Sequence, residues 1–163
     1  MPLEAVVHPF APLLGPGARV LVLGTMPSAA SRADGFYYGH PRNRFWPLMA
    51  ALFGGPVPLT RADKAALLTI NGVALWDVLA ACRIEGSSDA SIRAPRANDF
   101  APLLAAHPGL KLFANGQTAA GLYERLVRPV VGVPITPLPS TSPANAAWTP
   151  TRLLDAWDVL RRN

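Results

Sequence analysis

The chain has little cysteine and no long apolar run. Its single cysteine, Cys82, excludes an internal disulfide and cannot ligate an iron–sulfur cluster by itself. We interpret Cys82 as a small, buried apolar side chain. No apolar stretch approaches the ~20 residues of a membrane span, and the first residues lack the charged start and apolar core of a signal peptide. These absences predict a soluble, cytoplasmic protein that does not bind a membrane.

Charge is sparse and only mildly one-sided. Fifteen Lys and Arg residues stand against ten Asp and Glu, which gives a formal net charge of +5. This excess favours a polyanion or an acidic surface as partner, but it is too small to identify one. Half of the 163 residues are hydrophobic, which is enough for one compact domain with its own core. We therefore interpret residues 1–163 as a single domain.

Short apolar runs alternate with stretches of helical spacing. The expected strands are 19–23, 73–76, 110–114 and 133–138, and prolines place the last one at a sheet edge. The expected helices are 44–53, 61–69, 100–106, 117–127 and 150–161. Proline and glycine predict an irregular segment over residues 1–18, and residues 83–100 are also expected to be irregular. The alternation predicts an α/β fold, a three-layer α/β/α sandwich with a central four-stranded parallel sheet.

The most informative segment follows the first predicted strand. It reads Gly24-Thr25-Met26-Pro27-Ser28 and continues with Tyr37-Tyr38-Gly39-His40-Pro41-Arg42-Asn43-Arg44-Phe45-Trp46. Open α/β sheets hold their ligands at the carboxyl ends of their strands, where this segment begins. Gly24 permits close approach of the backbone, and the adjacent tyrosines offer flat faces to a heterocycle. We call this segment the first motif.

A polar loop follows the last predicted strand and should lie beside the first motif. After Leu138 and Pro139 it reads Ser140-Thr141-Ser142-Pro143-Ala144-Asn145. Hydroxyls and backbone amides can hold phosphates, and a proline-stiffened tip can wedge into the gap left by an extruded nucleotide. Taken alone, the same composition is typical of an ordinary loop. We call residues 138–146 the second motif.

Together the two motifs resemble the uracil-DNA glycosylase superfamily, and most closely its hypoxanthine-DNA glycosylase branch. The resemblance is dense over 20–53 and 138–146, weaker around 72–93 and 112–120, and absent in the first eighteen residues. It implies that Asn43 is catalytic, that Tyr38 stacks on a flipped base, and that the second motif enters the minor groove of DNA. The base-binding residues are expected to be Gly24, Thr25, Met26, Tyr38 and Asp77.

Asn43 suits both a catalytic and a structural role. A glycosylase that forms no covalent intermediate must position a water against C1′ of an oxocarbenium-like sugar, and a side-chain amide can hold that water. The alternative is that Asn43 only caps the helix that follows it. Other branches of the superfamily carry Asn, Asp or Glu where Met26 stands, and many carry histidine where Leu138 stands. The hypoxanthine branch also lacks the polar residue at the first position, which implies that the water-positioning role has moved to Asn43.

Three more polar residues stand in or near these motifs. Asp77 follows the second predicted strand and can either accept a hydrogen bond from a base N–H or cap the next helix. Asn115 follows the third strand and is interpreted as a turn and cap residue. His40 is expected to fix its loop through hydrogen bonds, because no second histidine stands near it to suggest a metal site.

The sequence therefore predicts a monofunctional DNA glycosylase that hydrolyses the N-glycosidic bond of a deaminated base, hypoxanthine before uracil, in base excision repair. The only lysines, Lys64 and Lys111, fall outside both motifs, which argues against a Schiff-base lyase. The expected partner is double-stranded DNA, with single-stranded DNA as a further candidate, bound by a monomer that needs no metal or cofactor. Four arginines are candidate phosphate contacts or plain surface residues: Arg42, Arg44, Arg93 and Arg96.

Three alternatives remain open from the sequence. Met26 and Leu138 motivate a catalytically weak or silent DNA-damage-binding module of the same fold. A uracil-specific glycosylase of the same superfamily is the second alternative. The third is an α/β domain that binds a small nucleotide, which a crevice at the strand ends alone would permit.

Overall fold

The computed structural model describes residues 3–163 and is built around a parallel sheet of four strands. The strand order is β3-β2-β6-β7, with β2 Val20–Gly24, β3 Val73–Asp77, β6 Lys111–Asn115 and β7 Ile135–Leu138. β2 is buried along its whole length because it is central and covered on both faces, which is why it reads as an uninterrupted apolar run. The expected four-stranded parallel sheet is confirmed, with the proline-containing β7 at one edge.

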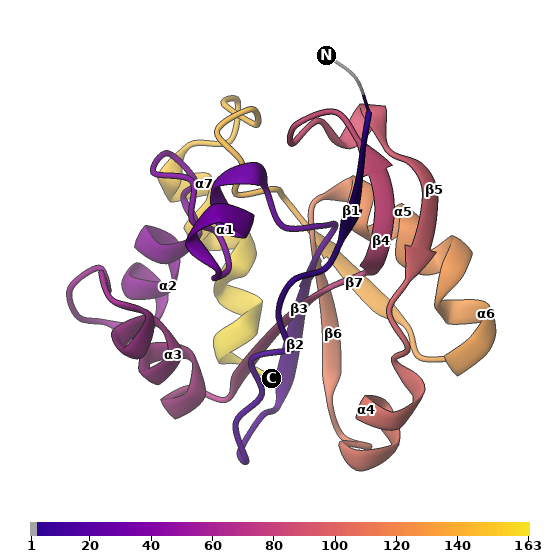
Figure 1. Ribbon diagram of the computed structural model, residues 1–163. Helices are drawn as coiled ribbons and strands as arrows, with labels where there is room; N and C mark the ends of the chain where they lie inside the picture. Colours follow the sequence, from indigo (N-terminus) through magenta and orange to yellow (C-terminus); the bar gives the residue numbers. More distant parts are fainter. Residues whose placement is uncertain (1–2) are drawn as a thin grey trace.

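Helices cover both faces of this sheet (Figure 1). One face carries α2 Phe45–Phe53, α3 Arg61–Ile70 and α7 Pro150–Trp157, and the other carries α4 Ala101–Ala106, α5 Gln117–Leu126 and α6 Arg128–Val131. Alternate residues of β2 serve the two cores: Val20 and Val22 join the core under α2 and α7, whereas Leu21 and Leu23 join the core under α5. The chain therefore folds as the predicted α/β/α sandwich.

The sheet brings the polar strand ends together. In the register of the parallel pairs, Gly24 is opposite Asp77, and Asn115 is opposite Leu138. Because all four strands run the same way, the first motif, Asp77, Asn115 and the second motif emerge at one edge. This edge is where parallel sheets bind their ligands.

A second, antiparallel sheet is the main feature that the sequence analysis missed. Its strands are β1 Glu4–Val7, β4 Leu79–Ile84 and β5 Arg93–Ala97, in the order β1-β4-β5. The prediction of irregular structure was therefore wrong for residues 4–7, 83–84 and 93–97. β5 has the sequence Arg-Ala-Pro-Arg-Ala, which lacks the apolar alternation of a half-buried strand, and its pairing with β4 contains register shifts. Its strand conformation depends on β4, which no local pattern reveals.

Smaller differences lie at helix ends and in the first motif. A short helix, α1 Ala29–Asp34, begins at Ser28, whose side chain accepts from the backbone N–H of Ser31, and ends at Gly35 in the left-handed conformation. The last helix is shorter than predicted, since the turn η2 Asp158–Arg161 is a 3-10 helix. Among residues 3–163, no helix is both long and apolar enough to cross a membrane.

Candidate active site

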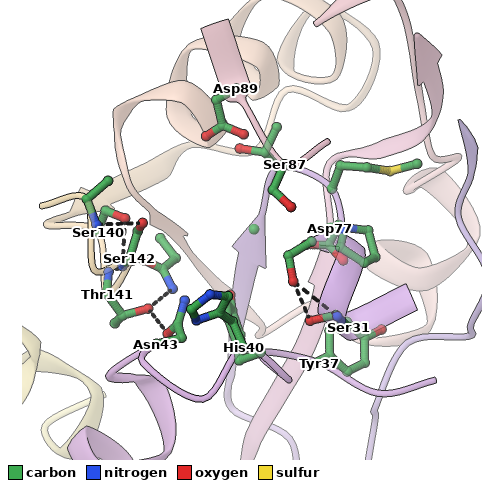
Figure 2. Close-up of a pocket in the computed structure, with 18 of the residues that line it drawn as sticks. Ser31, Tyr37, His40, Asn43, Asp77, Ser87, Asp89, Ser140, Thr141 and Ser142 are labelled. Carbon is green, nitrogen blue, oxygen red and sulfur yellow. Dashed lines mark hydrogen bonds between the residues drawn. The ribbon is translucent and has the colours of Figure 1, made fainter. Parts of the chain in front are cut away.

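A cavity of about 350 Å³ opens at the carboxyl ends of the parallel strands. Figure 2 shows Asn43 and Thr141 on one side of it, Asp77 on the other, and Ser87 with Asp89 at a third position along the rim. Residues from both motifs line this cavity: Gly24, Thr25, Met26, Pro27, Ser28, Tyr37, Tyr38, His40, Asn43, Ser140, Thr141, Ser142, Pro143 and Ala144. The structure thus brings together all the predicted base contacts and all the predicted DNA contacts of the second motif except Asn145, which lies in the adjoining groove, whereas none of the four candidate phosphate-binding arginines lines the cavity.

Asn43 is held by a hydrogen-bond network that spans the two motifs. Its Oδ1 accepts from the backbone N–H of Phe45 at 3.0 Å and from the hydroxyl of Thr141 at 2.8 Å. The N-cap residue of α2 is Arg44, which makes no side-chain cap bond, so Asn43 is not the cap itself but bonds the first backbone N–H of the helix from one residue further out, and it also lines the cavity. With both lone pairs of Oδ1 engaged, the amide presents its Nδ2 donor, for which residues 3–163 supply no acceptor.

Asn115 fixes Thr141 from the neighbouring strand. Its Nδ2 donates to Thr141 Oγ1 at 3.0 Å, and its Oδ1 accepts from the Thr141 backbone N–H at 3.0 Å. Thr141 is fully buried, so both of these bonds are formed away from water. Asn115 was interpreted as a turn and cap residue, but α5 begins after Gly116 without a side-chain cap. Its side chain instead orients the hydroxyl that orients Asn43.

Tyr38 lines the cavity with one ring face already supported. It stacks on Phe45 with a centroid separation of 4.1 Å and an angle of 19° between the rings. Its φ of 53° is in the left-handed region, which is uncommon for a large residue. Its hydroxyl is buried without a hydrogen-bond partner in the described part of the chain. Burial, followed by the charge of Asp77, raises the pKa of this hydroxyl, so it stays protonated.

Tyr37 is a buried packing residue that also lines the cavity. Its hydroxyl donates to Ala11 O at 2.8 Å, and its own backbone carbonyl accepts from the indole of Trp46 at 3.1 Å. His40 fixes its own loop, as expected, because its Nδ1 accepts from the backbone N–H of Arg42 at 3.1 Å. Both residues therefore hold the first motif in shape while lining the cavity.

Asp77 is a buried carboxylate at the end of β3. His8 Nε2 lies 2.7 Å from its Oδ2, and the two side chains are 3% and 6% exposed for His8 and Asp77, respectively. Burial raises the pKa of Asp77, and the hydrogen bond from His8 opposes that rise. The idea that Asp77 caps a following helix was wrong, because β4 begins two residues later.

Gly24 is required by this carboxylate. A Cβ at position 24 would stand 2.4 Å from Asp77 Oδ1 and 3.2 Å from the Tyr38 hydroxyl. Two other predicted base contacts stand close by: Thr25 and Met26 are both buried and both line the cavity. Met26 contributes a thioether, which has no strong hydrogen-bonding group to activate a water.

The second motif is anchored by Arg44. The Arg44 guanidinium donates to the carbonyl oxygens of Ser142 and Asn145, each at 3.0 Å, and also to that of Trp148. The side chain of Asn145 adds a bond to Ser140 O at 3.0 Å. Pro143 and Ala144 at the tip are exposed. Arg44 was a candidate phosphate contact, but its donors are used within the protein.

Several residues in the cavity wall, and His8 behind it, carried no signal in the sequence. His8 comes from the N-terminal segment, Ser87 and Asp89 come from the connection between β4 and β5, and Ser31 comes from α1. Asp77 and His8 are 69 residues apart, and only the second sheet brings them together. Within residues 3–163, no group of three or more His, Cys, Asp or Glu side chains is placed to hold a metal ion. Cys82 is buried, as interpreted.

Comparisons with known proteins agree with this geometry. A protein named hypoxanthine DNA glycosylase from Methanosarcina acetivorans is 34% identical over 155 residues, covering 94% of this chain and 97% of that protein. One of the same name from Methanosarcina barkeri is 33% identical over 137 residues, covering 83% and 86%. A solution NMR structure of a candidate uracil DNA glycosylase from M. acetivorans superposes with a TM-score of 0.79 at 34% identity, over 94% of this chain and 95% of that one.

The sequence model described as the uracil DNA glycosylase superfamily matches residues 11–161, nearly the whole chain and both motifs. The resemblance noted from the motifs is thereby confirmed. This protein belongs to the uracil-DNA glycosylase superfamily.

Proposed function

We propose that this chain is a monofunctional DNA glycosylase that releases a deaminated base by hydrolysing its N-glycosidic bond, with hypoxanthine preferred over uracil. The observation that carries the proposal is the fixed amide of Asn43 in the cavity, held through Thr141 by Asn115. Relatives named hypoxanthine DNA glycosylase that align over most of the chain support the choice of base. The reaction would serve base excision repair of DNA.

In this mechanism Asn43 acts by position. Since Oδ1 is engaged by Thr141 and by the backbone of Phe45, the amide offers an N–H donor to the cavity. This donor would hold the oxygen of a water against C1′ while the bond between the sugar and the base breaks. A positioned group of this kind removes the cost of orienting the water during the reaction. Other branches of the superfamily carry a water-positioning Asn, Asp or Glu where this chain has Met26, whose thioether cannot take that role.

Tyr38 would supply the stacking surface for the extruded base. Phe45 supports one face of the ring at 4.1 Å, so the base would lie on the face toward the cavity. Base–aromatic stacking is worth about 1–3 kcal/mol and tolerates purines and pyrimidines alike. Thr25 and Met26 complete the apolar side of the base site, and Gly24 lets the base approach the sheet.

The second motif would contact the DNA duplex. Its exposed tip, Pro143-Ala144, stands at the rim of the cavity, where it can replace the extruded nucleotide in the stack. Ser140, Thr141, Ser142 and Asn145 shape the loop, and the half-buried hydroxyls of Ser140 and Ser142 can donate to phosphates. We expect a monomer acting on double-stranded DNA, with single-stranded DNA as a weaker substrate.

Neither lysine is near enough to form a Schiff base with the sugar. The Lys64 ammonium lies over the ring of Trp46, 5.4 Å from its centroid, and the Lys111 ammonium donates to Asn163 at 2.9 Å. Neither residue lines the cavity. Simple hydrolysis, without a covalent enzyme–sugar intermediate, is therefore the reaction that this chain's own residues support.

The test is cleavage of duplexes that carry hypoxanthine, uracil or xanthine by the purified protein. Asn43→Ala should reduce cleavage at least ~100-fold, while Asn71→Ala, which removes an asparagine that ends α3, should leave the rate unchanged. Asn43→Asp keeps the two accepted hydrogen bonds but replaces the N–H donor, so its cleavage should also fall. An Asn43→Ala enzyme that cleaves like wild type would leave Asn43 with only a structural role at the start of α2.

Two outcomes would change the assignment. Release of uracil from every duplex, with hypoxanthine untouched, would make the protein a uracil-specific glycosylase. Binding of damaged DNA without any cleavage would favour the silent module, the second candidate function, which the thioether of Met26 in the cavity motivates.

A further inference from the structure

The buried pair of His8 and Asp77 has a defined hydrogen-bond direction. The second imidazole nitrogen of His8, Nδ1, accepts from the backbone N–H of Phe10 at 3.4 Å. Because Nδ1 accepts, the proton of the neutral imidazole is on Nε2, which lies 2.7 Å from Asp77 Oδ2. His8 therefore donates to the carboxylate of Asp77.

His8 lies in the N-terminal segment, outside both motifs. β1 pairs with β4, and the backbone N–H of His8 extends this pairing by donating to Ala80 O at 2.7 Å. The rings of Phe10 and Tyr37 enclose the imidazole, with centroids at 5.0 and 6.4 Å. The family match begins at residue 11, so His8 lies ahead of the segment by which the superfamily is recognised.

The two oxygens of Asp77 have different surroundings. Oδ2 is held by His8, whereas Oδ1 lies against Gly24 at the cavity wall. Within residues 3–163 no group donates a hydrogen bond to Oδ1. One oxygen is thus anchored, and the other is an unused acceptor beside the space proposed for the base.

We infer that His8 is a positioning residue that holds Asp77 so that Oδ1 accepts a hydrogen bond from the ring N–H that deamination creates. This inference rests on the proposed function. In adenine N1 and cytosine N3 the ring nitrogen carries a lone pair, whereas in hypoxanthine and uracil the same nitrogen carries a hydrogen. A carboxylate can only accept, so Oδ1 would pair with the deaminated base and face an unpaired lone pair in its parent.

The pair would therefore discriminate a damaged base from its parent rather than a purine from a pyrimidine. Guanine and thymine also carry a ring N–H at this edge, so their exclusion must come from the shape of the cavity and not from Asp77. A site built to bond a substrate N–H strongly rejects an analogue that lacks it, because its own buried group is then left unpaired.

Ionisation of Asp77 depends on the groups around it. His8 from the N-terminal segment, Tyr37 and Tyr38 from the first motif, and Asp89 from η1 Asp89–Ser91 all interact with its charge. Of these, His8 lowers the pKa of Asp77 against the effect of burial. Without His8 that pKa would rise further, so the carboxylate would take up its proton at a higher pH and lose its acceptor role there.

The first experiment changes the acceptor itself. In Asp77→Asn, His8 can still donate to the amide oxygen, which leaves an N–H donor toward the cavity. Calorimetric binding of free hypoxanthine and adenine should show a preference for hypoxanthine of at least ~10-fold in wild type, and the variant should lose or reverse it. Cleavage of hypoxanthine duplexes by the variant should fall at least ~100-fold.

The second experiment changes His8. His8→Ala should lower kcat/KM for hypoxanthine duplexes and move the acid limb of its pH profile to higher pH, because Asp77 then protonates more easily. His8→Gln, whose amide can donate in place of Nε2, should restore part of both. His107→Ala, a histidine at the end of α4 outside the cavity lining, is the matched control and should leave the profile unchanged. Thermal unfolding identifies any variant that fails to fold, and Asp77→Asn then supplies the independent measurement.

Two results would overturn the inference: an Asp77→Asn protein with the wild-type preference for hypoxanthine over adenine, or a folded His8→Ala protein with the wild-type pH profile. A wild-type protein that binds hypoxanthine selectively but cleaves no duplex would instead refute the proposed function and leave this inference standing.

Discussion

Thr141→Val isolates the link between the second motif and Asn43. Valine keeps the shape of the fully buried threonine but removes the hydroxyl that accepts from Asn115 and donates to Asn43. Asn115 Nδ2 then has no partner in the interior, while Asn43 Oδ1 keeps the backbone N–H of Phe45. The perturbation therefore loosens the catalytic amide without removing it.

The expected stability cost follows from the one buried donor left unpaired. Such a group costs about 1–3 kcal/mol in the free energy of unfolding, and a chain of this size loses roughly 2–4 °C in Tm for each kcal/mol. The variant should remain folded, so its loss of activity reflects the displaced amide and not unfolding. A displacement of about 1 Å in a catalytic group can reduce the rate ~100-fold. We expect kcat to fall about 10- to 100-fold.

Single-turnover cleavage of a hypoxanthine duplex measures this loss, and thermal unfolding measures the change in stability. Thr141→Ser retains the hydroxyl and should keep most of the rate. If Thr141 acts through Asn43, then the double variant Asn43→Ala/Thr141→Val should be no slower than Asn43→Ala alone. Independent, multiplying losses in the double variant, or a Thr141→Val enzyme at the wild-type rate, would refute the proposed network.

Two further predictions concern the surfaces that meet DNA. Tyr38→Ala should slow cleavage about 5- to 150-fold, which corresponds to the loss of one stacking contact. Tyr38→Phe should keep the cleavage rate and unfold at the same or a higher temperature, because it removes a buried hydroxyl without a partner. Slow cleavage by Tyr38→Phe would assign the hydroxyl a role in base binding. Replacing Pro143 and Ala144 with glycine should slow cleavage of double-stranded substrates more than that of single strands of the same sequence. An equal loss of rate on both substrates would mean that the tip shapes the cavity and does not wedge the duplex.

The central sheet was predictable because its strands are buried on both faces. β2 must be apolar at every position, and the parallel arrangement requires helices between the strands, so pattern and topology agree. The second sheet was not predictable in the same way. β5 contains two exposed arginines and a proline, and it is a strand only because β4 offers backbone hydrogen bonds to it.

The site divides along the same line. The residues that lie within a motif, such as Asn43 and Thr141, could be named from the sequence because their types and order are specific. Asn115 was dismissed as a turn residue because its contact with Thr141 spans 26 residues. The role of His8 could not be predicted, because it depends on a hydrogen bond to a buried carboxylate 69 residues away. Local patterns report which side chains a strand buries, but not which distant partner completes a hydrogen bond.

Arg44 has a consequence for engineering this protein. Its guanidinium belongs to the first motif and yet binds the carbonyl oxygens that give the second motif its shape. If the second motif of this protein were grafted into another glycosylase, it would therefore lose its internal scaffold unless the recipient carried an arginine at the position that corresponds to Arg44. The two loops form one transferable unit, and exchanging them as a pair is the route by which substrate range could be altered while the wedge keeps its form.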